Sequence, residues 1–258
     1  MELQQCPFCG STNLGKGYQL GNGQAYPDLY AYHSAASGSP VELILCKDCG
    51  CVVRARVSRP ELFPQYGPAR QEELLQHLNT HGILLCNENK ELPSLCGLGY
   101  SMENIIALIE QKQVFYCKAY KKRSTYLSVK AYQYLARCRP KKPFSPQAQT
   151  ILKAMEGTDM VDKDTLRANL GMEKKAFDRA FDLLLEHLAV TAIGGKRLNP
   201  NWYGYLYCTA EVWKRGVEGL HFHGDSRKAL WKLVGKDMSE ADFRSFAGPD
   251  PLSKSSST

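Results

Sequence analysis

Cys6-Pro7-Phe8-Cys9-Gly10 and Cys46-Lys47-Asp48-Cys49-Gly50 are the stretches that decide the fold of the first quarter of this chain. Both have the pattern C-x-x-C-G. Two thiolates three positions apart on a tight turn can face one centre, and the following glycine lets the backbone turn so that its amides face the sulfurs. The two turns together predict a closed site whose four ligands are Cys6, Cys9, Cys46 and Cys49.

Zinc is the ion that suits such a site, because it accepts thiolates and has no geometric preference from d-electrons. Four protein ligands leave no position for water or substrate, so we expect one structural Zn²⁺ whose binding energy stabilises a module with little core. The alternatives are a coincidental pair of motifs or a redox dithiol, although a redox motif normally occurs once within a βαβ pattern. Cys51 is a substitute for Cys49 that the spacing disfavours, and His33 is interpreted as a surface residue.

The residues around the two turns have a familiar arrangement. Gly15-Lys16-Gly17-Tyr18 follows the first turn and Gly38-Ser39-Pro40-Val41-Glu42 precedes the second. From Cys6 to Phe63 the chain resembles small bacterial zinc-ribbon proteins, and this resemblance implies a fold rather than an activity. Three prolines in residues 60–68 predict a boundary after the ribbon, which we place at residues 1–63.

The composition is that of a globular protein: 258 residues, of which 43% are hydrophobic and 23% charged. The first residues have no basic segment followed by an apolar one, and nowhere do 18 apolar residues run together, which predicts a cytoplasmic protein without a membrane segment. In such a compartment the other six cysteines are expected to be reduced thiols.

The charge is concentrated in one segment. The formal net charge is +7, but residues 111–155 contain 11 Lys and Arg and no Asp or Glu, so the remainder is neutral or slightly acidic. The order of residue types along this segment predicts a strand over 114–120, a tri-basic turn at Lys121-Lys122-Arg123, a return strand over 125–128 and a helix from Val129. Five tyrosines lie among the cations, so the segment is interpreted as a phosphate-binding surface with stacking rings; the alternative is a solvated hairpin whose tyrosines pack against the core.

Residues 143–247 have the pattern of a winged helix-turn-helix. Ser145-Pro146 starts a first helix, Asp162 caps a second, Gly171 supplies the turn, and a third runs from Glu173 to about Leu188 with one apolar face. The first turns of the third helix direct cations outward, where a recognition helix meets base edges. A strand over 190–193 then leads to a basic wing tip around Lys196 and Arg197. A protein-interaction module with the same helices is the alternative.

The order of these parts resembles the C-terminal portion of AlkZ-type winged-helix DNA glycosylases and their uncharacterised relatives. The matching positions run from Leu92-Pro93-Ser94-Leu95 through Tyr116-Cys117-Lys118-Ala119-Tyr120 and Thr125-Tyr126-Leu127-Ser128 to Trp202-Tyr203-Gly204-Tyr205. The resemblance implies DNA binding and, in the family, action on damaged bases through a Gln-x-Gln or Gln-x-Asp motif in an N-terminal helical region. Here Gln147-Ala148-Gln149 lies instead on the first helix of the winged domain, which puts catalysis in doubt.

Two further segments lie near the C-terminus. His221-Phe222-His223 could place two imidazoles together, but no acidic or cysteine partner stands at ligand spacing, so a structural loop is favoured over a metal site. Helices are expected after Asp225 or Ser226 and from Ser239 to Phe246. The Pro, Ser and Thr content of residues 248–258 predicts a disordered tail.

The sequence thus predicts an α+β protein with a zinc ribbon (1–63), a helical region with a basic β-hairpin (69–142) and a winged helix (143–247). Its expected function is DNA binding, with RNA as another nucleic-acid partner, no membrane partner and an unspecified oligomeric state. An AlkZ-like glycosylase and a protein-binding adaptor are the alternatives. The candidate nucleic-acid contacts are Lys118, Lys121, Lys122, Arg123, Lys130, Arg137, Arg139, Lys141, Lys142, Lys174, Lys175, Arg179, Lys196 and Arg197.

Overall fold

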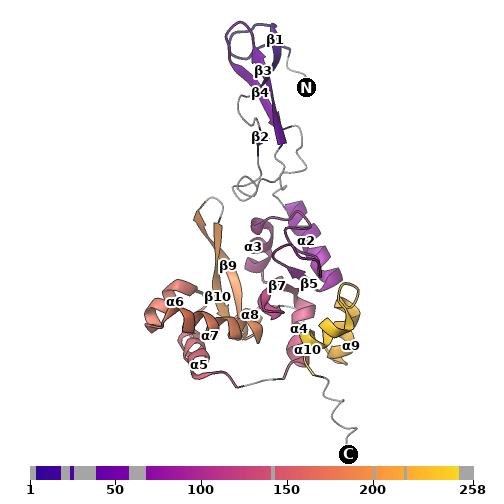
Figure 1. The fold of residues 1–258 in the computed structure, drawn as a ribbon, viewed down its shortest axis with the longest axis vertical. Helices are drawn as coiled ribbons and strands as arrows, with labels where there is room; N and C mark the ends of the chain where they lie inside the picture. Colours follow the sequence, from indigo (N-terminus) through magenta and orange to yellow (C-terminus); the bar gives the residue numbers. More distant parts are fainter. Residues whose placement is uncertain are drawn as a thin grey trace, which may run out of the picture. The chain divides into compact units, whose positions relative to one another are not determined.

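The computed structural model describes residues 4–18, 24–25, 39–57, 68–140, 143–199, 202–217 and 220–249. The chain divides into two compact units, Met1–Gln65 and Tyr66–Thr258, and has the mixed α+β architecture that the sequence predicts, with small antiparallel sheets (Figure 1). His33, residues 60–67 of the predicted boundary and residues 250–258 of the predicted tail lie outside the described ranges.

The N-terminal unit is a small antiparallel sheet. Its strands are β1 (Leu14–Tyr18), β2 (Gln24–Ala25), β3 (Ser39–Cys46) and β4 (Val52–Val57). Strand β3 is central and pairs with the other three. Leu14 at the start of β1 pairs with Cys46 at the end of β3, so the two C-x-x-C-G turns lie at the same end of the sheet.

The second unit begins with helix α2 (Pro68–His81) and strand β5 (Ile83–Leu85). Gly82 joins them with φ of +77°, and a Cβ at this position would lie 2.7 Å from Leu233 Cγ. Glycine is therefore required at position 82 for two reasons: the left-handed backbone and the close approach of the Leu233 side chain. Helix α3 (Met102–Glu110) follows, capped by Ser101, whose hydroxyl accepts a hydrogen bond from the Asn104 amide in a capping box.

The basic segment forms the predicted hairpin. Strands β6 (Val114–Tyr120) and β7 (Arg123–Ser128) pair antiparallel, and β5 adds to the far edge of β7 to give the order β5-β7-β6. Helix α4 (Val129–Cys138) starts at once after β7 because the Ser128 side chain accepts from the Ala131 amide.

Three helices and a second antiparallel sheet come next. They are α5 (Pro146–Met155), β8 (Val161–Asp162), α6 (Lys163–Leu170), α7 (Lys174–Glu186), β9 (Val190–Asn199) and β10 (Trp202–Thr209), with sheet order β8-β10-β9. Gly171 is left-handed at the end of α6, as expected of the turn residue. Helix α7 buries Phe177, Ala180, Phe181, Leu184 and Leu185, which is the apolar face expected from the sequence.

One part of this region differs from the prediction. The sequence predicts a wing tip at Gly194-Gly195-Lys196-Arg197, but these residues continue strand β9 and pair with β10. A Cβ on Gly195 would lie 2.7 Å from two atoms of Ile106, so this glycine permits close packing of α3 against the strand rather than a turn.

The chain ends with three short helices, α8 (Ala210–Lys214), α9 (Ser226–Val234) and α10 (Glu240–Ala247). Asp225 caps α9 and Ser239 caps α10, each through a side chain that accepts backbone amides. Within the ranges described above, no helix is long and apolar enough to cross a membrane.

The hairpin is the centre of the second unit, because its strands contribute to two hydrophobic clusters. One cluster joins α2, α3 and the hairpin to α5, α6 and α7, and the other joins the hairpin to α4, α9 and α10. Thr191 links β9 to β6 beside the first cluster. Its hydroxyl accepts a hydrogen bond from the Tyr116 amide and donates one to the Tyr116 carbonyl, both at 2.9 Å. The predicted boundary at residues 142/143 falls inside this unit.

Candidate metal centre and basic surfaces

The four cysteines of the C-x-x-C-G motifs converge in the N-terminal unit. Their sulfurs all lie within 4.8 Å of one another, and among the described residues no other group of three or more metal-ligating side chains does so. Cys6 Sγ and Cys49 Sγ are 3.7 Å apart, and Cys9 Sγ and Cys46 Sγ are 3.6 Å apart. Tetrahedral coordination at a zinc–sulfur distance of about 2.3 Å requires sulfurs about 3.8 Å apart, so this donor set fits the ion.

The turns that hold the sulfurs depend on glycine. Gly10 has φ of +73° and Gly50 of +75°, and their amides donate to the Cys6 and Cys46 carbonyls at 2.9 Å. Asp48 ties the two turns together, because one carboxylate oxygen accepts from the Ser11 hydroxyl and the other from the Asn13 side chain at 2.7 Å. These hydrogen bonds hold the pKa of Asp48 below its usual value.

Cys46 and Cys9 have pKa values shifted in opposite directions. Backbone amides, chiefly that of Cys49, lower the pKa of Cys46 to about 6. The Ser11 amide also favours the Cys9 thiolate, but interactions with the neighbouring Cys49 and Cys46 sulfurs outweigh it and raise the pKa of Cys9 to about 12. A metal ion must therefore displace protons when it binds, as thiolate sites require.

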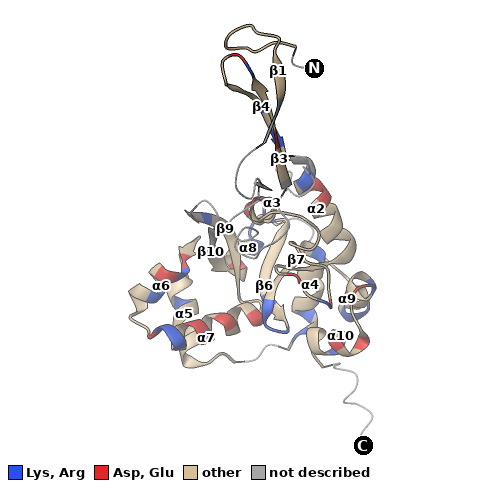
Figure 2. Cartoon of the chain, turned by 45° about the horizontal axis from the view of Figure 1, so that its top comes forward, with Lys and Arg blue, Asp and Glu red and all other residues tan. Residues whose placement is uncertain are grey.

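In the second unit, cations at the tip of the basic hairpin form ion pairs with acids from elsewhere in the unit. Figure 2 shows the basic tip of β6 beside α7 and α10, which both carry acidic residues. Lys121 Nζ lies 3.0 Å from Glu91 and 2.8 Å from Asp242. Arg123 also contacts Glu91, at 3.5 Å. The carboxylates of Glu91 and Asp242 have pKa values lowered first by their hydrogen bonds to Lys121. Much of the tip's charge is thus neutralised inside the protein.

Lys122 is the third cation of the tip and the most exposed, with 79% of its side chain accessible and Glu186 3.6 Å away. Lys118, on the preceding strand, lies 2.8 Å from Asp182. Lys163 of α6 lies 2.7 Å from Asp178. The three acids stand four residues apart on α7, so a carboxylate stripe on this helix is neutralised by lysines of β6, the tip and α6.

Arg139 is turned inward. Its Nε donates to the Phe246 carbonyl at 2.8 Å, and its two terminal nitrogens donate to the carbonyls of Glu186 at 2.5 Å and Ala119 at 2.7 Å. Two of these carbonyls lie in the last turns of α7 and α10, where the helix dipole favours a cation. Arg139 therefore joins α4 to three other elements with its donors engaged. Arg137 likewise donates to the Phe222 carbonyl.

The cations at the start of α7 remain open to solvent. Lys174, Lys175 and Arg179 are exposed, and within the described residues none has a carboxylate within 4.0 Å. Glu173 caps the helix by accepting the Lys175 and Ala176 amides at 2.9 Å, which lowers its pKa. Lys130 on α4 is also exposed without such a partner among the described residues.

Of the four remaining residues predicted to contact nucleic acid, the structure describes the side chain of one. Lys196 on β9 lies 3.8 Å from Asp162. Lys141, Lys142 and the side chain of Arg197 lie outside the part of the chain that the structure describes.

Four of the five hairpin-region tyrosines pack in the core instead of presenting rings to solvent. Tyr116, Tyr120, Tyr126 and Tyr132 are at most 4% exposed. The Tyr126 and Tyr205 hydroxyls lie 2.7 Å apart, and the rings of Tyr116 and Tyr205 are 4.6 Å apart. The interpretation of these four tyrosines as base-stacking rings is wrong, because the rings are buried. In the sequence, only the neighbouring Lys and Arg residues suggested that the rings were exposed.

The other sequence candidates do not assemble into a site. Gln147 and Gln149 are exposed on α5, where the Gln149 amide donates to the Phe144 carbonyl at 3.0 Å. His221 and His223 are exposed before α9, and no third metal-ligating side chain joins them within the described residues.

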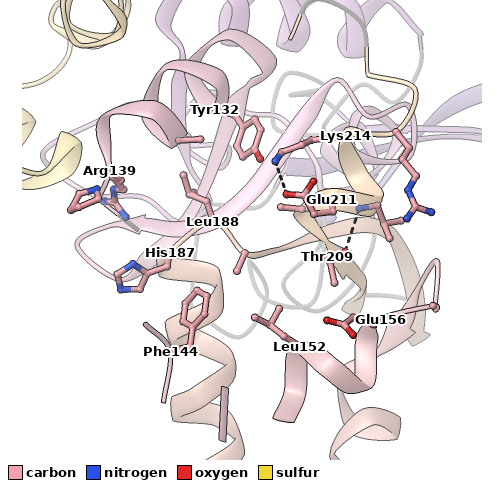
Figure 3. A pocket seen from close by; sticks show the side chains of 17 residues that line it. Tyr132, Arg139, Phe144, Leu152, Glu156, His187, Leu188, Thr209, Glu211 and Lys214 are labelled. Atoms are coloured by element: carbon pink, nitrogen blue, oxygen red, sulfur yellow. Dashed lines mark hydrogen bonds and ion pairs between the residues drawn. The ribbon is translucent and has the colours of Figure 1, made fainter. Parts of the chain in front are cut away.

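A cavity of about 660 Å³ is a feature that the sequence did not indicate (Figure 3). Its walls come from α4, the residues before α5, the end of α5, the residues after α7, and α8. Tyr132, Leu188 and Glu211 come from three of these walls. No local pattern could have revealed the cavity, because only the packing of these distant segments creates it.

Comparison with known protein families gives a match. A protein-family model described as "AlkZ related" matches residues 106–244, which is more than half of the chain and extends from α3 into α10. The four-cysteine unit lies outside the match. No curated protein and no solved structure matches the chain significantly.

Proposed function

This chain belongs to the AlkZ-related family, and from that premise we propose that it is a DNA-repair-related protein that binds duplex DNA through helix α7. Helices α5, α6 and α7 with the sheet β8-β10-β9 have the element order of a winged helix-turn-helix, which supports the assignment of α7 as its recognition helix.

The observation that carries the proposal is the distribution of charge along α7. Its acids Asp178, Asp182 and Glu186 are paired with lysines. Lys174, Lys175 and Arg179 at its start have no carboxylate within 4.0 Å among the described residues, and Glu173 and Asp178 act on Arg179 and Lys174 only through longer-range attraction. In helix-turn-helix proteins the N-terminal residues of the recognition helix contact base edges. The free cations of α7 occupy that position, and pairing of the acids limits repulsion of phosphate.

The hairpin has a smaller part in this proposal. Lys121, Arg123 and Lys118 are engaged with acids, and Arg139 with carbonyl groups. Lys130 is exposed without a carboxylate within 4.0 Å among the described residues, and Lys122 is 79% exposed with Glu186 at 3.6 Å, the longest of the ion pairs made by the tip, so these are the hairpin-region cations that we assign to phosphate binding. Lys196, which lies on β9 with 56% of its side chain exposed and Asp162 3.8 Å away, is the corresponding candidate on the β8-β10-β9 sheet.

For the N-terminal unit we propose one structural zinc ion held by Cys6, Cys9, Cys46 and Cys49. The sulfur spacing and the all-thiolate donor set support zinc over harder ions, which prefer oxygen ligands. When bound, the metal would cross-link the two C-x-x-C-G turns. With four protein ligands, the ion has no position open for chemistry.

The test of DNA binding is a triple variant, Lys174→Ala, Lys175→Ala and Arg179→Ala, titrated against duplex DNA at several salt concentrations. Removal of each phosphate-binding cation reduces the slope of log K against log salt by about 0.9, so the variant should bind more weakly and with a flatter slope. The control replaces Lys228, Lys232 and Lys236, three exposed lysines in and after α9, and removes the same charge from another surface.

Equal behaviour of the two triple variants would remove α7 from the interface. Binding of structured RNA in preference to duplex DNA would change the class of nucleic acid, and no salt-sensitive binding to either would favour a protein-binding adaptor. The glycosylase alternative is tested separately by incubating the protein with alkylated DNA and measuring released base.

A further inference from the structure

Two histidines lie on one face of helix α2, where this helix meets the end of α9. His77 and His81 are four residues apart, and their rings stack with centroids 4.3 Å apart and planes at 19°. His81 Nδ1 lies 2.7 Å from a carboxylate oxygen of Asp237, which follows α9. We refer to these three side chains as the histidine contact, because they join α2 to the segment after α9.

Beside the histidine contact, the backbone of α2 packs closely against α9. A Cβ on Gly82, directly after α2, would lie 2.7 Å from Leu233 Cγ. The Asp237 amide donates to the Val234 carbonyl at 3.1 Å, which places the carboxylate of Asp237 at a turn that begins inside α9. Residues 233–237 are therefore the part of the C-terminal helices on which the histidine contact acts.

His77 is the member of the contact that does not accommodate an additional proton. Its Nε2 is buried and has no hydrogen-bond partner among the described residues. Protonation would put an N–H without an acceptor at this atom, and would place a positive ring against the stacked ring of His81. Burial, with the charge of His81 as the second cause, accordingly lowers the pKa of His77 from its usual value. The site thus suits the neutral ring.

The charges that act on His77 have opposite signs. His81, when positive, opposes protonation of His77, whereas the carboxylate of Asp237 favours it by a smaller amount. That single carboxylate is already engaged by His81. Charged residues elsewhere on α2, on α3 and at the end of α9 do not shift the pKa of His77; among them are Arg70, which pairs with Glu73, and Glu103, Glu110, Lys232 and Lys236.

We propose that the histidine contact is a pH-sensitive connection between α2 and the end of α9, with His77 as its proton sensor. While His77 is neutral, residues 233–237 stay docked on α2. When Nε2 takes up a proton, the ring needs an acceptor that only water can supply, so the docked segment opens. The connection depends neither on DNA binding by α7 nor on the metal of the N-terminal unit.

The sign of the effect follows from the lowered pKa of His77. The docked state is fully stable above the pKa of an exposed histidine, about 6.5, and loses stability as the pH falls below it, because the open state then binds the proton more readily. Carboxyl groups with ordinary pKa values of about 4 remain ionised down to pH 5.5, so the interval from pH 7.5 to pH 5.5 isolates the histidine contact from the acid-sensitive pairs of the hairpin tip.

The experiment measures hydrogen exchange of the Gly235 and Asp237 amides in the full-length protein at pH 7.5 and pH 5.5. Both amides donate to carbonyls of α9, and their exchange rates are corrected for the intrinsic effect of pH. Their protection factors should fall severalfold between the two pH values. One ring with an exposed pKa of about 6.5 limits the fall to about tenfold.

Two variants should change this fall in opposite directions. His77→Phe keeps a ring that can stack on His81 but cannot be protonated, so the protection factors should be nearly equal at the two pH values. Asp237→Asn keeps an oxygen that accepts from His81 but removes the negative charge that favours a proton on docked His77, so the fall should be larger than in the wild type. The matched control is His221→Gln, which removes an exposed histidine before α9 and should leave the wild-type fall unchanged.

Three results would overturn the proposal. The first is equal protection of Gly235 and Asp237 at pH 7.5 and pH 5.5 in the wild type. The second is a fall in His77→Phe as large as that in the wild type, which would assign the proton to another group. The third is a smaller fall in Asp237→Asn than in the wild type, and this comparison decides the question if His77→Phe does not fold.

Discussion

At the scale of single residues, Arg139 shows how a cation that resembles a DNA-binding residue in the sequence can instead hold the fold. Its guanidinium bridges the carbonyls of Ala119, Glu186 and Phe246, and burial lowers its pKa from the ordinary value. Arg139→Met would leave these buried carbonyls without their donor. We expect a loss of about 2–4 kcal/mol in the free energy of unfolding, measured by denaturant titration.

The control for this prediction is Lys130→Met, which removes a cation of the same helix that is exposed and has no acidic partner among the described residues. It should leave stability within about 0.5 kcal/mol of the wild type. If Arg139→Met kept full stability and lost DNA affinity, Arg139 would be a surface residue that binds DNA.

Residue-level features with local causes were predictable from the sequence, and those with distant causes were not. Ser145 and Asp162 cap helices as expected, because a cap bonds amides two or three residues away. Cation partners could not be predicted in the same way. The acids that meet Lys121 lie 30 residues before it and 121 after it, at Glu91 and Asp242, and only the folded chain brings them together.

At the scale of elements, the hairpin tip is a strained turn that ion pairs of Lys121 hold in place. Lys121 and Lys122 both have left-handed backbones, with φ of 46° and 60°, where a two-residue hairpin turn usually carries Asn-Gly. The ammonium group of Lys121 connects this turn to Glu91 and to Asp242 of α10. The strained tip is thus held by ion pairs to two segments outside the hairpin.

These ion pairs predict a pH dependence with a definite sign. The pKa values of Glu91 and Asp242 are lowered in the folded protein, so their contribution to stability is present above the unfolded carboxyl pKa of about 4 and is lost as the pH falls through the folded values. Lys121→Met should therefore lower the Tm at pH 7, and its difference from the wild type should shrink toward pH 3. A Tm difference that is constant across this range would exclude the ion pairs as the cause.

Elements with a long amphipathic pattern were predicted, whereas those fixed by pairing were missed. Helix α7 has the apolar face expected from its sequence, and α5 starts at the expected Ser145-Pro146. Strands β5 and β8 have three and two residues, too few for periodicity, and exist because β7 and β10 offer them an edge. Helix α8 has five residues, starts at the Thr209 cap and was not anticipated.

At the scale of the whole molecule, the two units differ in what stabilises them. The second unit contains two hydrophobic clusters. Among the described residues of the first unit, the hydrophobic side chains that are fully buried are Cys6 and Cys46, each 1% exposed, and both belong to the proposed zinc site. The cysteine spacing was sufficient to predict this arrangement, because the sulfurs themselves form the centre of the unit.

Metal removal should consequently unfold one unit and spare the other. With little apolar burial, the first unit depends on the binding energy of the ion, whereas the second depends on packing. We expect the purified protein to release about one zinc ion per chain on thiol modification in the presence of a chelator. Amide hydrogens of β3 and β4 should then exchange rapidly, while those of β6, β7 and α7 keep their protection. The Gly10→Ala and Gly50→Ala variants, which strain the left-handed turns, should release the metal at lower concentrations of the modifying reagent. A single cooperative loss of protection across residues 39–57 and 114–186 would show instead that the two units fold as one.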